Sequence, residues 1–286
     1  MVLPIHDFNP LRRRPVVTWL LIAVNVAVFV FVEPVLTSAF GMHSPSAHTV
    51  CDQNRFFDQW GAIPKELVDN QQLPSAPTGQ VGTSVTGQTG CVVSSPAPFH
   101  KSPVFSVLTA MFLHGSWLHL LGNMLFLGVF GNNVEDRMGR GVYLVFYLLC
   151  GFVATYGFAL FEPGSTTTLI GASGAIAGVL GAYFLIFPRA WVVGLLTFLF
   201  FIPFWLPAWA VLGSWFVLQY LYFIGVGTSD GGSVAYGAHV VGFVFGALAT
   251  LPFVRRLRSA GPTRAHPPRH HRWVRHTPWS APPPRR

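Results

Sequence analysis

Long apolar runs separated by short polar stretches dominate the sequence. A helix needs about 20 apolar residues to cross the hydrocarbon core of a bilayer, so each run predicts a membrane span. Pro203 and Pro207 interrupt the longest run, and we expect residues 191–206 to form an interfacial connection. The pattern thus predicts an all-α polytopic membrane protein. Its six predicted spans are residues 16–32, 117–134, 142–160, 171–187, 208–224 and 234–254.

The polar segment 33–103, between the first two spans, is unusually long and has two parts. The stretch 74–98 is rich in Ser, Gly, Thr and Pro, a composition typical of flexible linkers. The earlier part has enough apolar side chains to favour a short helix on the membrane surface. Those side chains are Phe56, Phe57, Trp60 and Ile63.

This pattern divides the chain into three regions. Residues 1–15 form a short N-terminal segment, and residues 16–254 form one membrane domain that includes the long segment 33–103. Residues 255–286 form a basic, proline-rich tail. The tail has too few apolar residues to build a core, so we expect it to be disordered.

Composition excludes a soluble globular protein. Only 10% of the 286 residues are charged, 51% are hydrophobic and the mean hydropathy is +0.49. Soluble domains carry about a quarter charged residues. The first predicted span follows the basic run Arg12–Arg14, as in a signal peptide, but no clear small-x-small cleavage site follows it. We therefore expect an uncleaved anchor. No organelle-targeting presequence precedes it, which favours a bacterial plasma membrane over a mitochondrial inner membrane.

The distribution of the basic residues predicts the orientation. Cytoplasmic segments of membrane proteins carry an excess of Lys and Arg. With a cytoplasmic N-terminus, 15 of the 18 Lys and Arg residues lie inside, and only Arg55, Lys65 and Lys101 lie outside. We therefore expect both ends to be cytoplasmic.

The formal charge of +8 also bears on partners. A basic tail is sometimes a nucleic-acid-binding segment, but here the basic clusters directly border spans, where anionic lipids attract them. We expect membrane lipids and no nucleic acid as partners. Nothing in the sequence specifies an oligomeric state.

The three cysteines differ in their surroundings. Cys150 lies in an apolar run and is expected to pack there. Cys51 and Cys91 share the segment 33–103 and are candidates for a disulfide if that segment faces an oxidising compartment. With His43 and His48 they also offer zinc-ligand types, but their irregular spacing disfavours a metal site.

Strongly polar residues inside or beside a span predict function, because hydrocarbon offers them no water. Five such residues lie in three separate regions: His114, His119 and Asn123 around the second span, Ser173 in the fourth and His239 in the sixth. In the expected topology all five lie near the outer side at similar depth.

Small residues predict close contact between the fourth and sixth spans. Glycine or alanine at spacings of three or four lets two helix backbones approach in lipid. The residues in question are Gly174, Gly178 and Gly181 in the fourth span and Ala238, Gly242 and Gly246 in the sixth. A serine and a histidine on these helices would then come within about 3 Å.

The residue types predict nucleophilic catalysis. Ser173 needs a base to take its proton, and the neutral imidazole of His239 is suited to this near pH 7. No carboxylate lies in a span near His239, so we expect a dyad. His119 and Asn123 share a helical face and are expected to stabilise an oxyanion, together with the Ser173 backbone N–H.

Three motifs resemble those of the rhomboid intramembrane serine proteases. They are HGSWLHLLGNM at 114–124, GASG at 171–174 and AHVVG at 238–242. The resemblance extends over about 105–253 and the first span. It implies a six-helix bundle with both ends cytoplasmic, and single-span membrane proteins as substrates, cut near the outer face without a cofactor.

The resemblance also implies roles for individual residues. Ser173 matches the nucleophile, His239 the base, and His119 with Asn123 the oxyanion-stabilising pair. His114, Gly171 and Gly174 match accessory positions around the site. Glu135 and Arg137 match a Glu-x-Arg segment that makes structural hydrogen bonds, and Gly242 and Gly246 match the small-residue ladder after the base.

Two positions depart from the family's pattern. Many members have a tyrosine beneath the catalytic imidazole where this chain has Ala177, so Tyr236 or Tyr183 is expected to replace it. Some members have Trp-Arg in the first loop, where this chain has Phe105 and Ser106. The anchoring of that loop is therefore not transferable.

Other interpretations compete with catalysis. Taken alone, Ser173 is typical of a packing residue, His239 of a structural hydrogen bond, and His119 with Asn123 of an interhelical clamp. A non-cleaving relative that binds membrane proteins is the alternative function, but such relatives usually lack the serine or the histidine. A transporter would need midplane charges or internal repeats, and neither is found.

Overall fold

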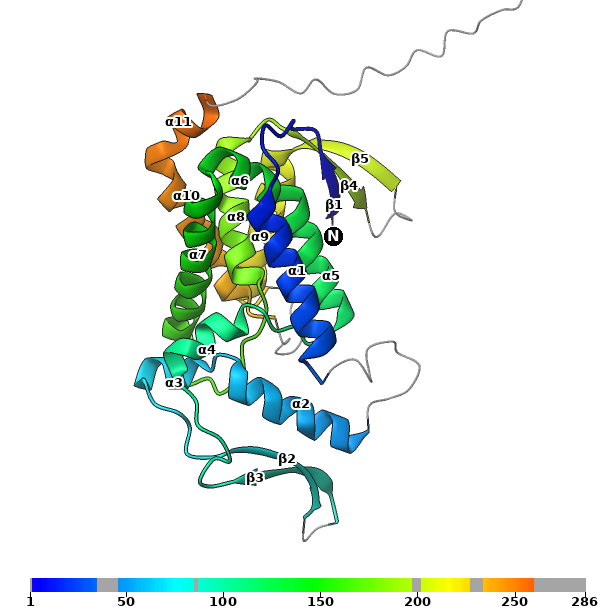
Figure 1. Ribbon diagram of the computed structural model, residues 1–286, viewed down its shortest axis with the longest axis vertical. Coiled ribbons are helices and arrows are strands. Elements are labelled where there is room, and N and C mark those ends of the chain that lie inside the picture. Colours follow the sequence, from blue (N-terminus) through cyan, green and yellow to red (C-terminus); the bar gives the residue numbers. More distant parts are fainter. Residues whose placement is uncertain (1, 35–45, 85–86, 197–201, 227–233, 260–286) are drawn as a thin grey trace, which may run out of the picture.

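The computed structural model describes residues 2–34, 46–84, 87–196, 202–226 and 234–259. Its main body is a bundle of helices standing roughly side by side (Figure 1). Each predicted span coincides with a helix or, for the second span, with a continuous run of helical segments. The segments are α1 (Val16–Phe31), α5 (Trp117–Phe126), η1 (Leu127–Gly131), α6 (Asn132–Met138), α7 (Arg140–Phe161), α8 (Ser173–Ile186), α9 (Ala208–Phe223) and α10 (Tyr236–Thr250).

Two helical stretches, Arg140–Phe161 and Tyr236–Ser259, have the length and composition to cross a membrane. The helices α1, α8 and α9 are apolar but shorter. A helix of 14 residues, such as α8, is about 21 Å long, which is less than the hydrocarbon thickness of about 30 Å. The fold is helix-rich, and the number of crossings stays a prediction.

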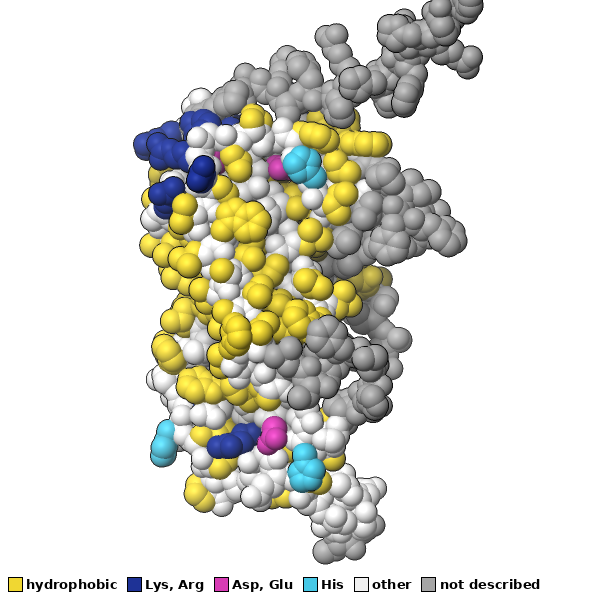
Figure 2. Space-filling model, turned by 45° about the vertical axis from the view of Figure 1, so that its right-hand side comes forward, with side chains coloured by type: hydrophobic (Ala, Val, Ile, Leu, Met, Phe, Trp, Pro, Cys, Tyr) yellow, Lys and Arg dark blue, Asp and Glu magenta, His cyan; other side chains and the backbone are white. Residues whose placement is uncertain are grey.

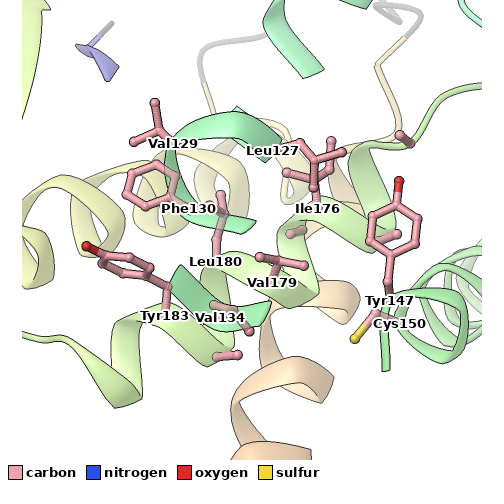
Figure 3. Packing of buried hydrophobic residues seen from close by; sticks show 14 of the residues in the cluster. Leu127, Val129, Phe130, Val134, Tyr147, Cys150, Ile176, Val179, Leu180 and Tyr183 are labelled. Atoms are coloured by element: carbon pink, nitrogen blue, oxygen red, sulfur yellow. The ribbon is translucent and has the colours of Figure 1, made fainter. Parts of the chain in front are cut away.

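Helix α8 lies inside the bundle and packs against α7, α9, α10 and η1 (Figure 1). Its Ile176, Val179 and Leu180 are buried in a large apolar cluster with Phe130 of η1 and Tyr147 of α7 (Figure 3). Between helices in lipid, close packing supplies the attraction that water supplies in soluble cores. The first turn of α8 therefore sits on a tightly packed support.

The predicted close approach of the fourth and sixth spans is present. A Cβ atom added at Gly246 would lie 2.0 Å from the carbonyl oxygen of Gly178, and one added at Gly242 would lie 2.3 Å from that of Gly174. Real Cβ atoms essentially never approach other atoms so closely. Any larger residue at these positions would push α8 and α10 apart.

The second predicted span is interrupted by the π-helix η1 and continues as α6. In α6 the carboxylate of Glu135 accepts hydrogen bonds from the backbone N–H groups of Val17 and Thr18, at 3.0 and 2.7 Å. Arg137 contacts the carbonyl oxygen of Leu257 at 3.5 Å. Glu135 thus connects α6 to the start of α1, and Arg137 connects it to the helical segment around Leu257.

The all-α expectation is wrong in one respect, because the structure contains strands. The N-terminal strand β1 (Val2–Asp7) pairs with β4 (Trp191–Leu196), and β4 pairs with β5 (Ile202–Pro207), all antiparallel. The predicted connection 191–206 is therefore largely a hairpin at one end of the bundle (Figure 1). Pro203 and Pro207 lack an N–H and disfavour a helix there.

The outer segment is also more ordered than its composition predicts. It contains α2 (Ala47–Trp60), α3 (Pro64–Asp69), a hairpin of β2 (Ala76–Thr83) and β3 (Thr89–Ser94), and α4 (Pro103–Ala110). A disulfide joins Cys51 of α2 to Cys91 of β3. The expectation of a flexible linker over 74–98 is thus wrong, because strand pairing and the cross-link order most of it. The predicted short helix is present as α2, which ends at Trp60, and its place on the membrane surface stays a prediction.

A buried ion pair fixes this outer segment. The Lys101 ammonium lies 2.7 Å from the Glu66 carboxylate, with both side chains almost fully buried. It also donates to the backbone carbonyl of Asp58 at 2.8 Å. Burial lowers the pKa of Lys101 and raises the pKa of Asp58. Through these two contacts Lys101 connects α3 and the end of α2 to the chain that enters α4.

At the opposite end, α10 continues through η2 (Leu251–Phe253) into α11 (Val254–Ser259), so the tail begins as a helix rather than in disorder. Arg258 donates two hydrogen bonds to the carbonyl oxygen of Leu185. Figure 2 shows apolar side chains across the middle of the molecule and Lys and Arg gathered near α6 and α11. The remainder of the tail, 260–286, lies outside the described residues.

Candidate active site

The segment before α8 is held by the outer segment. The backbones of Ala62 and Leu169 exchange two hydrogen bonds, at 3.0 and 2.7 Å. The hydroxyl of Thr168 donates to the carboxylate of Asp58. A Cβ at Gly61 would lie 2.4 Å from a methyl carbon of Thr168, so no other residue fits there. These contacts fix the chain that leads to Ser173.

Gly171 turns this segment into the helix. Its φ of +118° is a conformation that L side chains rarely adopt, and its N–H donates to the carbonyl oxygen of Ala110 at 2.8 Å. A Cβ at Gly171 would lie 2.8 Å from Nε2 of His119 and 3.6 Å from Nδ2 of Asn123. The glycine therefore allows both predicted oxyanion residues to approach the start of α8.

Ser173 is the first residue of α8, and His239 lies in the first turn of α10. The distance from His239 Nε2 to Ser173 Oγ is 2.8 Å, a hydrogen bond between residues 66 positions apart. The close α8–α10 contact described above makes this distance attainable. The first N–H groups of a helix have no intrahelical partner, so those of α8 are available to an anion.

The structure adds a residue that sequence reasoning missed. Nδ1 of His239 lies 2.7 Å from Oε1 of Gln219, whose side chain is 3% exposed. Gln219 is the only amide side chain in helix α9, which is mostly apolar, and that was the signal available in the sequence. The three residues Ser173, His239 and Gln219 form one hydrogen-bonded row across three helices.

Another correction concerns the aromatic partner of His239. Trp215 of α9 lies nearest, with ring centroids 5.9 Å apart and ring planes inclined by 32°. Tyr236 contacts His239 edge-on at 6.4 Å. Tyr183 points elsewhere, since its hydroxyl donates to Asp7 at 2.7 Å. Trp215 was not anticipated, because nothing in the sequence indicates which face of α9 meets α10.

His114 supports the predicted oxyanion residues. Its side chain is fully buried, and burial lowers its pKa to about 3, so the imidazole is neutral. The amide group of Asn123 therefore donates to Nε2 of His114, at 2.9 Å. An amide has two hydrogens, so the second remains available to a ligand. The His119 ring lies against that of His114, with centroids 5.1 Å apart.

The buried carboxyl group of Glu33 contacts the backbone of His114. Both oxygens of Glu33 accept the backbone N–H of His114, at 3.0 and 3.2 Å. Glu33 directly follows the first predicted span, and burial raises its pKa to about 8.

Among the described residues, no group of three His, Cys, Asp or Glu side chains is placed to hold a metal ion.

Comparison with known families agrees with this geometry. The family model described as the rhomboid domain matches residues 101–256. That range covers more than half of the 286 residues, and it contains Ser173, His239 and Gln219. The chain belongs to the rhomboid family, and it is a membrane protein of that family's helix-rich fold.

Curated relatives include a protease and organellar proteins. Rhomboid protease GlpG of Yersinia pestis (strain Pestoides F) is 28% identical over 167 residues, 57% of this chain and 54% of that protein. RHOMBOID-like protein 6, mitochondrial, of Arabidopsis thaliana is 35% identical over 102 residues, 34% of this chain and 33% of its own. Rhomboid-like protein 11, chloroplastic, of the same plant is 35% identical over 82 residues, 28% of this chain and 29% of its own. The chain thus spans between 29% and 54% of the length of these relatives.

Proposed function

We propose that the chain is an intramembrane serine endopeptidase that cuts membrane-spanning substrates near the outer membrane face. The observation that carries the proposal is the 2.8 Å distance between His239 Nε2 and Ser173 Oγ. A serine with a neutral imidazole at this distance is poised to lose its proton as it attacks a carbonyl carbon. The likeness to a rhomboid protease over 57% of the chain supports the same reaction class.

The reaction proceeds through an acyl-enzyme. Ser173 Oγ adds to the substrate carbonyl while His239 takes the hydroxyl proton, and His239 then returns that proton to the leaving amine. A water molecule, activated by His239, hydrolyses the ester and frees Ser173. No cofactor takes part.

The oxyanion of the tetrahedral intermediate needs donors where its charge develops. His119 and Asn123 lie close to Gly171, two residues before the nucleophile, and the first N–H groups of α8 have no partner within the helix. We assign the oxyanion to these donors. His114 has a supporting role, since it orients the Asn123 amide.

The proposed setting is a bilayer crossed six times, with both chain ends cytoplasmic. The bundle then opens outward, so that water reaches Ser173 from the outer side. Substrates are single-span membrane proteins, and helix-breaking Gly or Pro near the cut site exposes the peptide bond. The proposed location is a bacterial plasma membrane, although relatives carry mitochondrial and chloroplastic names.

Covalent labelling of detergent-purified protein with a fluorophosphonate probe tests the proposal. We expect the wild type to label and both Ser173→Ala and His239→Ala to lose labelling, because the first removes the nucleophile and the second its base. Circular dichroism and thermal unfolding check that each variant is folded. A folded wild type that does not label, or a Ser173→Ala variant that labels equally, would contradict the proposal and favour the non-cleaving binder.

A further inference from the structure

Gln219 is a buried polar group that the Ser–His pair alone does not require. A primary amide is unfavourable in an apolar environment unless it forms hydrogen bonds. Its Oε1 atom lies 2.7 Å from His239 Nδ1, on the ring edge opposite the bond to Ser173. The carbonyl oxygen of this side chain thus contacts the candidate base.

The position of Gln219 on α9 is fixed by further contacts. Trp215 stands four residues earlier, so the two side chains share a helical face. The Trp215 ring lies beside the His239 ring, with centroids 5.9 Å apart and planes inclined by 32°, while Gln219 contacts the Nδ1 atom of that ring. Helix α9 packs against both α8 and α10. A single helix therefore contacts the imidazole through two side chains.

This geometry decides which imidazole nitrogen carries the hydrogen. An amide oxygen is only an acceptor, so a 2.7 Å contact with it requires a hydrogen on Nδ1. Neutral His239 then has its lone pair on Nε2, directed at the Ser173 hydroxyl. The other tautomer would present an N–H to Ser173 and have no capacity to accept its proton.

We propose that Gln219 is a positioning residue, which selects the Nδ1–H tautomer of His239 and holds its Nε2 atom toward Ser173. The proposal rests on the proposed function and extends the expected dyad to a Ser–His–Gln row. A neutral amide orients the ring as the aspartate of a serine protease triad does. It does so without placing a carboxylate in a membrane helix, where a charge is costly.

Rates of fluorophosphonate inactivation test the proposal, because the probe reacts with Ser173 itself. The serine oxygen forms a bond to phosphorus, the P–F bond breaks, fluoride leaves and the serine proton passes to His239. Gln219→Met keeps the length of the side chain but removes the acceptor, whereas Gln219→Glu retains an acceptor oxygen. Ser214→Ala, on the same helix, is the control, since Ser214 bonds only to the Val211 carbonyl in the described residues.

We expect Gln219→Met to lower the maximal inactivation rate at least about tenfold, with the probe concentration for half-maximal rate within about twofold. Gln219→Glu should restore most of that rate, and Ser214→Ala should leave it unchanged. A Met variant that reacts at the wild-type rate would overturn the proposal, as would equal losses in Met and Glu variants that are folded.

A spectroscopic measurement gives a readout that does not depend on activity. The ¹⁵N chemical shifts of histidine-labelled protein distinguish the two tautomers, and the spectrum of His239→Ala identifies the signals of His239. We expect the Nδ1–H form in the wild type and a mixture in Gln219→Met. An Nε2–H form in the wild type would overturn the tautomer assignment even if Ser173 labels. Failure of all labelling with the Nδ1–H form present would instead contradict only the proposed function.

Discussion

At the scale of residues, the polar groups around Ser173 are connected by hydrogen bonds. His239 bonds to Ser173 and Gln219, Asn123 bonds to His114, and the His114 backbone bonds to Glu33. Unsatisfied polar groups are costly away from water. These hydrogen bonds therefore stabilise the fold as well as orient the groups of the proposed reaction.

Glu33 makes stability depend on pH. Its pKa in the folded protein is about 8, above the ordinary value of 4.5, so folding strengthens proton binding. The contribution of Glu33 to the free energy of unfolding is fully present below about pH 4.5. It is lost as the pH rises through about 8. Glu33→Gln keeps an acceptor for the His114 N–H and cannot ionise.

We therefore expect the stability of Glu33→Gln relative to wild type to grow between pH 5 and pH 9. The change is on the order of a few kcal/mol, less where water screens the carboxylate. Thermal unfolding in detergent at a series of pH values measures it. A difference that stays constant over this range would show that Glu33 does not titrate there.

At the scale of elements, the site depends on how closely α8 and α10 pack. Ser173 and His239 are the first contact of that interface, and the glycine contacts lie directly beyond it. Because the two backbones are in contact at these glycines, the distance between the two helices is set by that contact. The interface thus sets the 2.8 Å hydrogen bond more firmly than either side chain does.

Gly246→Ala tests this dependence. The added methyl group would meet the Gly178 carbonyl, so the helices must separate. Overpacking of this kind costs about 1–3 kcal/mol, and we expect slower fluorophosphonate labelling of Ser173 as well. Gly141→Ala in α7 is the matched control, because a Cβ there meets nothing within 4 Å. Equal effects of the two substitutions would contradict the packing argument.

At the scale of the whole molecule, the two ends of the bundle differ in chemistry. One end has the disulfide and the buried Lys101–Glu66 pair. The other has the sheet β1–β4–β5 and most of the described basic side chains (Figures 1 and 2). The proposed topology would place the first end at an oxidising outer face and the second in the cytoplasm.

Topology reporters test the orientation in cells. We expect green fluorescent protein fused after Arg286 to fluoresce, because it folds in the cytoplasm. Alkaline phosphatase, which needs an oxidising compartment, should be active when inserted at Gly87 in the exposed turn between β2 and β3. The reverse pattern at both positions would invert the proposed topology.

The pattern of apolar residues predicted some elements of the structure correctly and missed others. The apolar runs located the helices of the bundle within a few residues, because burial in lipid demands a run of apolar side chains whatever the tertiary arrangement. The same pattern missed β4 and β5, whose residues are as apolar as those of a span. Apolarity reports the environment of a segment and does not by itself distinguish strand from helix when the run is short.

The sequence by itself determined where the helices of the bundle lie and how charge is distributed, and it predicted Ser173 and His239 as site residues, because each rests on local composition or on residue type. Only the tertiary structure decided that Cys51 meets Cys91, that Trp215 rather than Tyr183 lies against His239, and that Gln219 bonds to it. Those facts depend on the rotation of each helix about its axis. Packing between distant segments sets that rotation, and no local pattern encodes it.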